Sequence, residues 1–237
     1  MIRLDKYLAD MGAGTRSEVK REIARGKVTV DGAVIRRPEF KINAQMQVIC
    51  YQGGTLPYVR YEYYMLNKPA GVVSATQDKN DRTVLDLISN KKRKDLFPVG
   101  RLDKDTEGLL LITNDGNLAH RLLAPRKHVD KIYYAEIDGV VTEDDRAAFA
   151  FGVDIGEKQP AREAHLEILD VNSDAQKSTI RLTIHEGKFH QVKRMFQAVG
   201  KEVVYLKRLS MGTLMLDKKL KPGEYRELTD EELKELC

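Results

Sequence analysis

The chain begins with a segment in which apolar and polar positions follow a helical period. The apolar positions are Ile2, Leu4, Leu8 and Met11. Gly12 and Gly14 come next, so this spacing predicts a short helix that ends at the glycines. Thr15 then opens a second helix, because Glu18 stands three residues later and completes the pattern of a capping box. We expect this second helix to end at Gly26.

A small sheet is predicted after the two helices. Val28–Val30 and Val34–Ile35 are extended runs joined by Asp31-Gly32, and an Asp-Gly pair between such runs is a strong hairpin signal. Residues 53–57 then have the glycine- and proline-rich composition of a linker. We therefore predict a small N-terminal α/β domain at residues 1–56 and a second domain at residues 57–237.

The second domain mixes strand and helix patterns without strict alternation. Strands are predicted at residues 63–66, 71–76, 131–137, 166–169, 179–184 and, as a longer extended segment, 203–216. Helices are predicted at residues 84–88, 118–124, 143–151 and 189–199, with a short one after a capping box of Thr229 and Glu232. This order favours an α+β fold with a mixed, largely antiparallel sheet.

The helix predicted at residues 189–199 is amphipathic. We expect one face to pack inward, formed by Phe189, Val192, Phe196 and Val199. Another face carries His190, Lys193, Arg194 and Gln197. From Arg181 to Arg208 the chain holds seven Lys and Arg and two acidic residues, so this region is a basic band. A solvated helix face without a ligand is the plain alternative.

Positive charge is unevenly distributed along the chain. Residues 1–60 hold 11 Lys and Arg and 6 Asp and Glu, whereas residues 61–237 hold 29 and 30, so the excess lies in the first quarter. This asymmetry favours a module that binds a polyanion, attached to a nearly neutral body. A merely solubilising surface is the alternative.

Composition also bounds the class of protein. With 32% charged residues and no run near the ~20 apolar residues of a membrane span, we expect a soluble protein that does not enter a membrane. No signal peptide is expected, and Cys50 and Cys237 lack metal-type spacing, which suits the reducing cytoplasm. The histidines form no pair with a plausible third ligand nearby, so we expect no metal site.

The segment at residues 100–116 carries the strongest candidate chemistry. Arg101 and Asp103 lie in a charged loop that leads directly into Leu109–Ile112, a short apolar run that reads as a buried strand. A carboxylate held there beside basic groups can serve as a nucleophile. Its alternating acidic residues are also typical of a calcium loop, but Asn114 stands where that loop needs a bidentate Glu, which argues against calcium.

Three short motifs in the first 50 residues carry a resemblance to a known domain. They are Arg3-Leu-Asp-Lys-Tyr-Leu, Thr15-Arg-Ser and Gly26-Lys-Val-Thr-Val-Asp-Gly. With them the segment resembles the S-four-type RNA-binding domain, whose second helix and following loop face RNA. The resemblance implies RNA contacts for Arg3, Arg16, Lys20, Arg21, Arg25 and Lys27.

Further motifs, spaced along the rest of the chain, carry a second resemblance. The first two are Leu66-Asn-Lys-Pro-x-Gly71 and Gly100-Arg-Leu-Asp-x-x-Thr-x-Gly-Leu-Leu110. The others are Lys131-x-Tyr133, Glu186-Gly-x-x-His-Gln-Val-Lys-Arg-Met195 and Pro222-Gly-Glu-Tyr225. In this order they closely resemble the RNA pseudouridine synthases, and in particular the branch that modifies the small ribosomal subunit.

The resemblance implies an isomerase that converts a uridine in RNA to pseudouridine. Asp103 would be the essential carboxylate, which attacks or deprotonates at the sugar, and the sequence leaves both roles open. Arg101 would take the place of the extruded nucleotide or grip the backbone. Tyr133 would stack on the base, Lys193 would pair with Asp103, and Arg194 is expected to contact RNA.

The resemblance also implies the substrate and the partners. No redox or hydrolytic step is involved, so no cofactor is expected. We expect a monomer that acts on 16S ribosomal RNA or on a small-subunit assembly intermediate. The same reaction on 23S RNA and a non-catalytic RNA-binding assembly factor are the alternatives. Metal-assisted phosphoesterase activity would need clustered ligands that the sequence does not offer.

Overall fold

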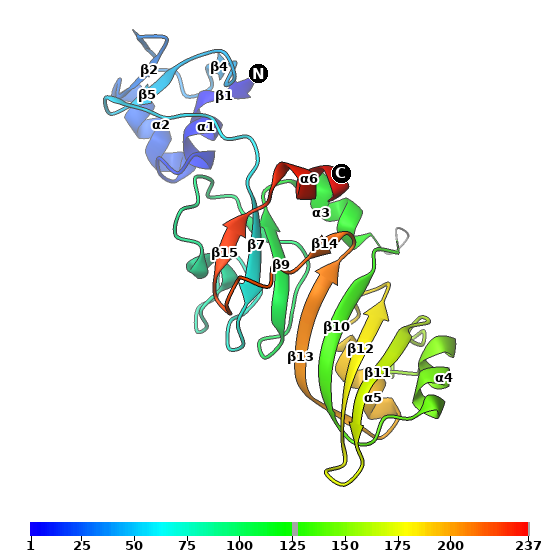
Figure 1. Ribbon diagram of the computed structural model, residues 1–237. Helices are drawn as coiled ribbons and strands as arrows, with labels where there is room; N and C mark the ends of the chain where they lie inside the picture. The colour runs from blue at the N-terminus through cyan, green and yellow to red at the C-terminus, as the bar shows by residue number, and fades with distance from the viewer. Residues whose placement is uncertain (125–127, 237) are drawn as a thin grey trace. The chain divides into compact units, whose positions relative to one another are not determined.

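The computed structural model describes residues 1–124 and 128–236, so Cys237 lies outside the described residues. These residues form two compact units, drawn together in Figure 1. The N-terminal unit comprises residues 1–62 with 89–96, and the sheet unit comprises residues 63–88 with 97–237. The domain boundary predicted after residue 56 stays a prediction.

The N-terminal unit contains two short helices and two small sheets. Its helices are α1 (Leu4–Asp10) and α2 (Arg16–Ala24). Its strands are β1 (Ile2–Arg3), β2 (Val28–Val30), β3 (Ala33–Val34), β4 (Lys41–Ile42), β5 (Ile49–Tyr51) and β6 (Gly54–Thr55). β1 pairs with β4, and the other strands follow the order β3-β2-β5-β6.

The local signals in this unit are confirmed. Thr15 and Glu18 form the predicted capping box at the start of α2, with the Thr15 N–H donating to the Glu18 carboxylate at 2.7 Å. Asp31 and Gly32 have φ values of 50° and 84°, the left-handed conformation that the turn between β2 and β3 requires. The apolar sides of both helices pack against the strands in one buried cluster, whose fully buried members include Leu4, Leu8, Val19, Ile23 and Ile42.

The sheet unit is organised around one large sheet, with strand order β11-β12-β10-β13-β9-β7-β15. Its strands are β7 (Tyr63–Lys68), β8 (Phe97–Pro98), β9 (Glu107–Thr113), β10 (Lys131–Asp138), β11 (His165–Asn172), β12 (Lys177–Ile184), β13 (Glu202–Met211), β14 (Leu214–Met215) and β15 (Tyr225–Glu227). β13 runs parallel to β9, whereas the other neighbours in this order are antiparallel. The predicted mixed, largely antiparallel sheet in an α+β fold is therefore confirmed.

The helices of the sheet unit pack beside this sheet. They are α3 (Gly116–Leu123), α4 (Glu143–Phe151), α5 (Gln191–Ala198), α6 (Asp230–Leu236) and the 3-10 turn η1 (Val84–Leu87). In Figure 1, α4 lies beside β11. α6 starts with the predicted capping box, because Thr229 and Glu232 exchange hydrogen bonds.

The structure corrects one predicted segment in kind and another in its first residue. Residues 71–76 do not form a strand; within them Val73 makes an isolated bridge to Thr83. The helix predicted from residue 189 begins at Gln191 instead, because His190 takes a left-handed φ of 49° that a helix cannot continue through. Phe189 therefore lies outside the helix and is 65% exposed, not packed inward.

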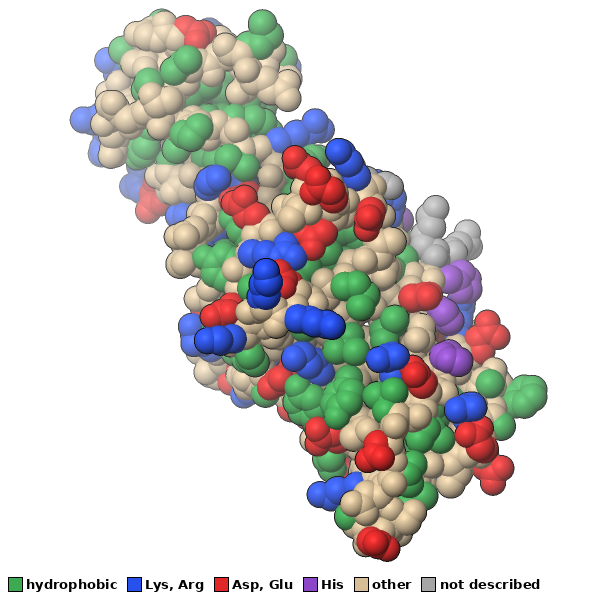
Figure 2. All heavy atoms as spheres, in the orientation of Figure 1, with side chains coloured by type: hydrophobic (Ala, Val, Ile, Leu, Met, Phe, Trp, Pro, Cys, Tyr) green, Lys and Arg blue, Asp and Glu red, His purple; other side chains and the backbone are tan. Residues whose placement is uncertain are grey.

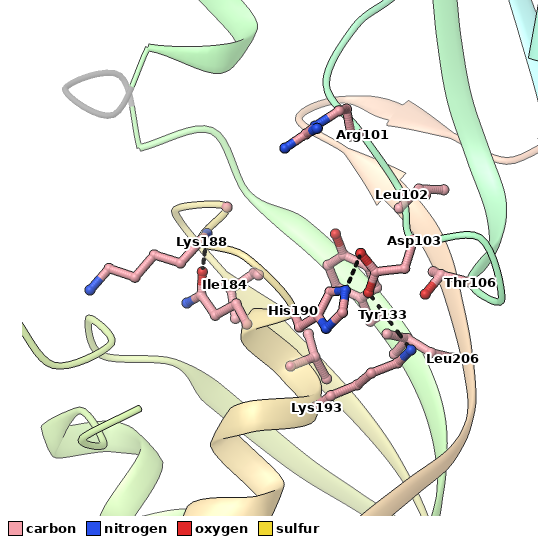
Figure 3. A pocket seen from close by; sticks show the side chains of 13 residues that line it. Arg101, Leu102, Asp103, Thr106, Tyr133, Ile184, Lys188, His190, Lys193 and Leu206 are labelled. Atoms are coloured by element: carbon pink, nitrogen blue, oxygen red, sulfur yellow. Dashed lines mark hydrogen bonds and ion pairs between the residues drawn. The ribbon is translucent and has the colours of Figure 1, made fainter. Parts of the chain in front are cut away.

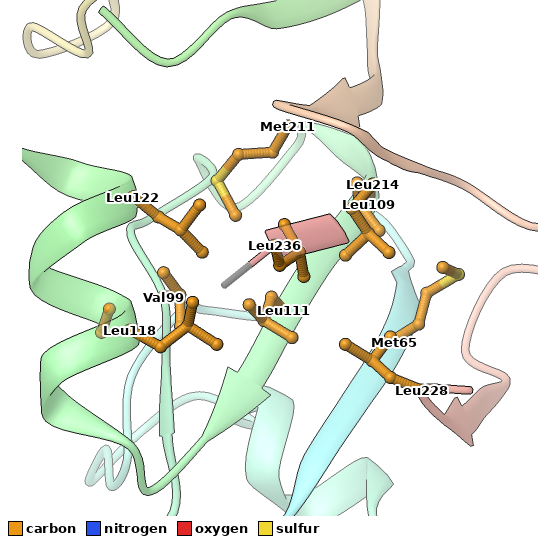
Figure 4. Close-up of a cluster of buried hydrophobic side chains, with 11 residues drawn as sticks. Met65, Val99, Leu109, Leu111, Leu118, Leu122, Met211, Leu214, Leu228 and Leu236 are labelled. Atoms are coloured by element: carbon orange, nitrogen blue, oxygen red, sulfur yellow. The ribbon is translucent and has the colours of Figure 1, made fainter. Parts of the chain in front are cut away.

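A buried apolar cluster fixes β9, the strand that follows the loop of Asp103. Figure 4 shows Leu109 and Leu111 of β9 together with Leu118 and Leu122 of α3, and with Leu236 of α6. Both β9 leucines are fully buried. Burial of one such side chain stabilises the fold by about 1.5–3 kcal/mol, so β9 is a rigid support for the loop before it.

The surface of the sheet unit carries charges of both signs. On the face shown in Figure 2, basic and acidic side chains are interspersed over this unit, as expected from the near-neutral count of residues 61–237. Among the described residues, no helix has the length and apolar character needed to cross a membrane.

Candidate active site

The loop of Asp103 enters the sheet at a fixed point. It connects β8 to β9, and β9 is bordered by β7 on one side and β13 on the other. Gly108, the second residue of β9, has a φ of 102°. A Cβ at this position would lie 2.2 Å from the carbonyl oxygen of Arg208 in β13. Only glycine allows the two strands to approach this closely, so the position of the loop relative to β13 is defined.

Lys68 holds the same loop through hydrogen bonds to its backbone. This lysine ends β7 and is fully buried. Its Nζ donates to the carbonyl oxygens of Asp103 at 3.0 Å, Lys104 at 3.3 Å and Thr106 at 2.8 Å, and also to its neighbour Pro69 at 3.1 Å. Burial lowers the pKa of the Lys68 ammonium to about 8, although nearby carboxylates oppose the shift. The side chain thus orders the backbone on which the Asp103 carboxylate stands.

The Asp103 carboxylate faces two nitrogen-bearing side chains from the start of α5. His190 Nε2 lies 3.6 Å from Asp103 Oδ1, and Lys193 Nζ lies 3.7 Å from Asp103 Oδ2. Figure 3 shows both side chains pointing toward the carboxylate. The histidine contact is an ion pair when the imidazole is protonated. Asp103 is 28% exposed, so its oxygens are sheltered but remain accessible.

Lys193 is shared between two aspartates. Its Nζ donates to both carboxylate oxygens of Asp105 at 2.6 Å, which is closer than its approach to Asp103. Partial burial alone would raise the pKa of Asp105, but the hydrogen bonds and positive charge of Lys193 outweigh this and lower it. The Lys193–Asp103 pairing expected from the sequence is present as a longer ion pair, and its catalytic role stays a prediction.

A small pocket lies beside the carboxylate. It has a volume of about 70 Å³ and includes Arg101, Asp103, Tyr133, His190 and Lys193 in its lining. The predicted catalytic and substrate-binding residues are thus brought together. Tyr133, on β10, is 8% exposed. The apolar part of the pocket lining includes Leu102, Ile184, Val192 and Leu206.

A larger groove adjoins this pocket. The groove has a volume of about 810 Å³ and shares Arg101, Asp103 and His190 with the pocket. Arg101 is exposed, and no hydrogen bond or ion pair joins its side chain to any residue that the structure describes. Its guanidinium is therefore available to a ligand at the border of pocket and groove.

The RNA-binding residues predicted in the N-terminal unit fall into two groups. Arg3 and Arg16 are held by the buried carboxylate of Asp5, at 2.9 and 3.4 Å. Burial would raise the pKa of Asp5, but hydrogen bonds from these two arginines outweigh it and lower the pKa. The other cations are exposed on α2 and the loop after it, namely Lys20, Arg21, Arg25 and Lys27. Of these, Arg25 pairs with Glu22 at 2.9 Å, whereas Lys27 borders a groove of about 460 Å³.

Arg194, also predicted to contact RNA, is engaged with protein groups. Its Nη1 donates to the Glu157 carboxylate at 2.8 Å and to the Phe189 carbonyl at 3.2 Å, and its Nη2 donates to the Ile155 carbonyl. An arginine with three such partners has little freedom to reach a phosphate. Its role in RNA binding stays a prediction.

Sequence reasoning missed Lys68, Asp105 and His190 as parts of this site. His190 and Lys193 were placed on one polar helix face, and their three-residue spacing was the available signal. Lys68 stands in the motif Leu66-Asn-Lys-Pro-x-Gly71, but the motif does not show that this lysine is buried and bonded to the Asp103 loop. Among the described residues, no group of three or more His, Cys, Asp or Glu side chains is placed to hold a metal ion.

Comparison with protein families gives two matches. Residues 62–198 match the family described as RNA pseudouridylate synthase, and residues 2–48 match the S4 domain. The first match includes the Asp103 loop, Tyr133 and the start of α5.

Individual relatives align over almost the whole chain. A Bacillus subtilis protein described as "Uncharacterized RNA pseudouridine synthase YtzG" is 48% identical over 98% of this chain and 97% of its own. The "Ribosomal small subunit pseudouridine synthase A" of Escherichia coli K12 is 42% identical over 98% of both chains. A solved structure described as "Crystal structure of pseudouridylate synthase" covers all of both chains, with a TM-score of 0.70 and 37% identity.

Proposed function

The chain belongs to the RNA pseudouridylate synthase family and is an isomerase with an S4 domain, and on this premise we propose that it converts a specific uridine of 16S ribosomal RNA to pseudouridine. We assign Asp103 as the catalytic carboxylate. The observation that carries the assignment is the place of Asp103 between pocket and groove, 3.6 Å from His190 and 3.7 Å from Lys193, with Tyr133 in the pocket wall.

In the proposed reaction, the bond between N1 of uracil and C1′ of ribose breaks and a bond between C5 and C1′ forms. The C5 proton is lost and N1 gains one, so product and substrate contain the same atoms and no co-reactant is needed. Asp103 either attacks the sugar or removes a proton from it, and its accessible carboxylate supports both routes. A paired base must first be flipped out of its helix, which costs roughly a few kcal/mol.

The pocket supplies what the flipped base needs. Stacking on Tyr133 would recover about 1–3 kcal/mol, and the apolar wall formed with Ile184 and Leu206 would exclude water from the detached uracil. Arg101, free at the border of the groove, would grip the backbone or occupy the place of the extruded nucleotide. Lys193 would balance the charge of Asp103 while Asp105 holds the lysine in position.

The choice of small-subunit RNA rests on the relatives. The E. coli protein that aligns over 98% of this chain is named for the small ribosomal subunit, and the chain pairs the same catalytic family with an S4 domain. The substrate would be this RNA or a small-subunit assembly intermediate. We place the reaction in the cytoplasm, where ribosomes assemble, and assign it to a monomer, because one chain supplies every named residue of the pocket.

Mapping of pseudouridine across ribosomal RNA tests this function. Cells that lack the protein should lose one pseudouridine from 16S RNA, and the wild-type gene should restore it, whereas Asp103→Asn should not. Asp170→Asn, an exposed aspartate on β11, is the matched control and should restore the modification.

The same map separates the alternatives. A pseudouridine lost from 23S RNA instead would move the substrate to the large subunit. An unchanged map in both RNAs would contradict isomerisation of ribosomal RNA and favour an assembly factor without catalytic activity. Restoration by Asp103→Asn would remove Asp103 from the catalytic role.

A further inference from the structure

Phe189 is an exposed aromatic residue beside the candidate active site. It precedes α5, and 65% of its surface is exposed. Its ring stacks on the imidazole of His190, with 3.8 Å between the ring centroids and 20° between the planes. The Phe189 ring is therefore stacked on His190 on one side, and most of its surface is open to solvent.

The backbone that carries this pair is held in place. His190 takes the left-handed φ of 49° that turns the chain into α5 and leaves Phe189 outside the helix. Arg194, one turn into α5, donates to the Phe189 carbonyl and is itself fixed by Glu157 and the Ile155 carbonyl. The exposed ring therefore stands on an ordered turn. An aromatic ring with few rotatable bonds on such a support binds a partner at a low cost in conformational entropy.

The ring pair connects the groove to the reacting carboxylate. Phe189 lines the groove of about 810 Å³, along with Arg101 and Lys131. His190 lines both the groove and the pocket, and its Nε2 lies 3.6 Å from Asp103 Oδ1. An RNA strand whose uridine enters the pocket must continue through space near this groove. A nucleotide next to the target uridine therefore comes within reach of the Phe189 ring.

We propose that the stacked Phe189–His190 pair is a platform for a nucleobase adjacent to the target uridine. The proposal rests on the function proposed above, because it takes single-stranded RNA as the ligand of the groove. A planar base fits the geometry, since it would continue the stack that His190 and Phe189 begin. The free guanidinium of Arg101 suits the phosphate that joins the two nucleotides. In this role Arg194 is a positioning residue that acts through the Phe189 carbonyl.

Fluorescent RNA tests the platform directly. The probe is a short single-stranded RNA with one central uridine and 2-aminopurine on each side, since 2-aminopurine loses fluorescence when it stacks. All proteins are full-length and carry Asp103→Asn, so that binding is read without turnover. Phe189→Leu removes the ring and keeps an apolar side chain, whereas Phe189→Tyr keeps the ring. Because residue 189 is mostly exposed, neither change threatens the fold.

We expect the parent and Phe189→Tyr to quench the probe and Phe189→Leu to leave it bright. Phe189→Leu should also weaken binding by about 5- to 150-fold, the range measured for loss of one stacked base. On a matched RNA with abasic residues in place of 2-aminopurine, the three proteins should bind alike. Equal quenching by Phe189→Leu would overturn the proposal, as would an equal loss of affinity on both RNAs, which would mean that Phe189 acts only through His190.

Failure of the proposed function is read separately. If the wild-type chain forms no pseudouridine in cells while the ring-dependent quenching is present, isomerisation fails and the platform stands. If pseudouridine forms at the normal rate in Phe189→Leu and quenching does not depend on the ring, the platform fails and the isomerase stands.

Discussion

Two groups of cations, one in each unit, are held in different ways. In the N-terminal unit, Lys20, Arg21 and Lys27 are exposed, and none forms an ion pair with a residue that the structure describes. In the sheet unit, Lys68 and Lys193 each donate to two or more protein oxygens. Free cations can meet phosphates, whereas engaged cations shape a loop. We therefore expect the exposed cations of α2 and the loop after it to contribute to RNA affinity, and the engaged lysines of the sheet unit to order the candidate site.

Loss of the Asp103 carboxylate should lower kcat strongly and leave the affinity for RNA nearly unchanged. Asp103→Asn keeps the side-chain shape but removes the charge. We expect kcat to fall by about 10²–10⁴ if Asp103 acts as a base, and by more if it is the nucleophile. The dissociation constant for RNA should change less than about twofold, because the exposed cations of α2 are untouched. Single-turnover kinetics and filter binding measure the two quantities, and Asp170→Asn should change neither.

Replacement of Lys68 should weaken both the loop and the fold. Lys68→Met has a similar volume but leaves the loop carbonyls without their buried donor. We expect the free energy of unfolding to fall by about 1–3 kcal/mol, and kcat to fall with it as Asp103 loses its support. Urea denaturation and single-turnover kinetics measure these effects. Lys104→Met, at an exposed position in the same loop, should change the free energy of unfolding by no more than about 0.5 kcal/mol.

The lowered pKa of Lys68 gives this test a pH dependence. The folded pKa is about 8, below the ordinary value near 10.4, so between these values the unfolded chain binds more protons than the folded one. The contribution of Lys68 to the free energy of unfolding therefore rises with pH between these two pKa values. The free energy of unfolding of the wild type, relative to Lys68→Met, should increase by about 1–2 kcal/mol from pH 7.5 to 9.5. A flat or falling difference would show that Lys68 is not held as a desolvated ammonium.

Removal of the free cations of α2 and the loop after it should weaken RNA binding and leave kcat unchanged. The triple variant Lys20→Ala, Arg21→Ala and Lys27→Ala loses three candidate phosphate contacts. We expect the slope of log Kd against log salt to become shallower by about 2, with kcat at saturating RNA unchanged. The matched control loses the same charge from exposed positions of the sheet unit, at Lys218, Lys219 and Lys234. If both triples change the slope equally, affinity is not concentrated in the N-terminal unit.

Local signals predicted most of the fold. The capping boxes at Thr15 and Thr229 and the Asp31-Gly32 turn are each satisfied within a few residues, so the sequence alone contains the cause. The buried strand β9 was equally clear, because four consecutive apolar residues are bounded by turn formers. The strand predicted at residues 71–76 failed, since strand pairing depends on a distant partner that the pattern does not contain.

The site was predicted in outline and missed in its contacts. Motif resemblance singled out Arg101, Asp103, Tyr133 and Lys193, and the fold brings them around one pocket. The closer partner of Lys193 is Asp105, which lies 88 residues away in sequence and competes with Asp103 for the same ammonium. No spacing rule settles such a competition. Phe189 was misplaced because its period matched a helix that the left-handed His190 interrupts.

A finer comparison lies within the N-terminal unit, between Arg16 and Lys20 on α2. Arg16 is 3.4 Å from the buried carboxylate of Asp5, whereas Lys20 is exposed without an ion pair among the described residues. Lys20→Ala should therefore make the salt slope of RNA binding shallower by about 1, while Arg16→Ala should change it by less, since the Arg16 guanidinium is partly engaged by Asp5. Asp5 keeps Arg3 as a partner in Arg16→Ala, so the unit should stay folded by circular dichroism. Equal slopes for the two variants would mean that RNA draws Arg16 away from Asp5 on binding.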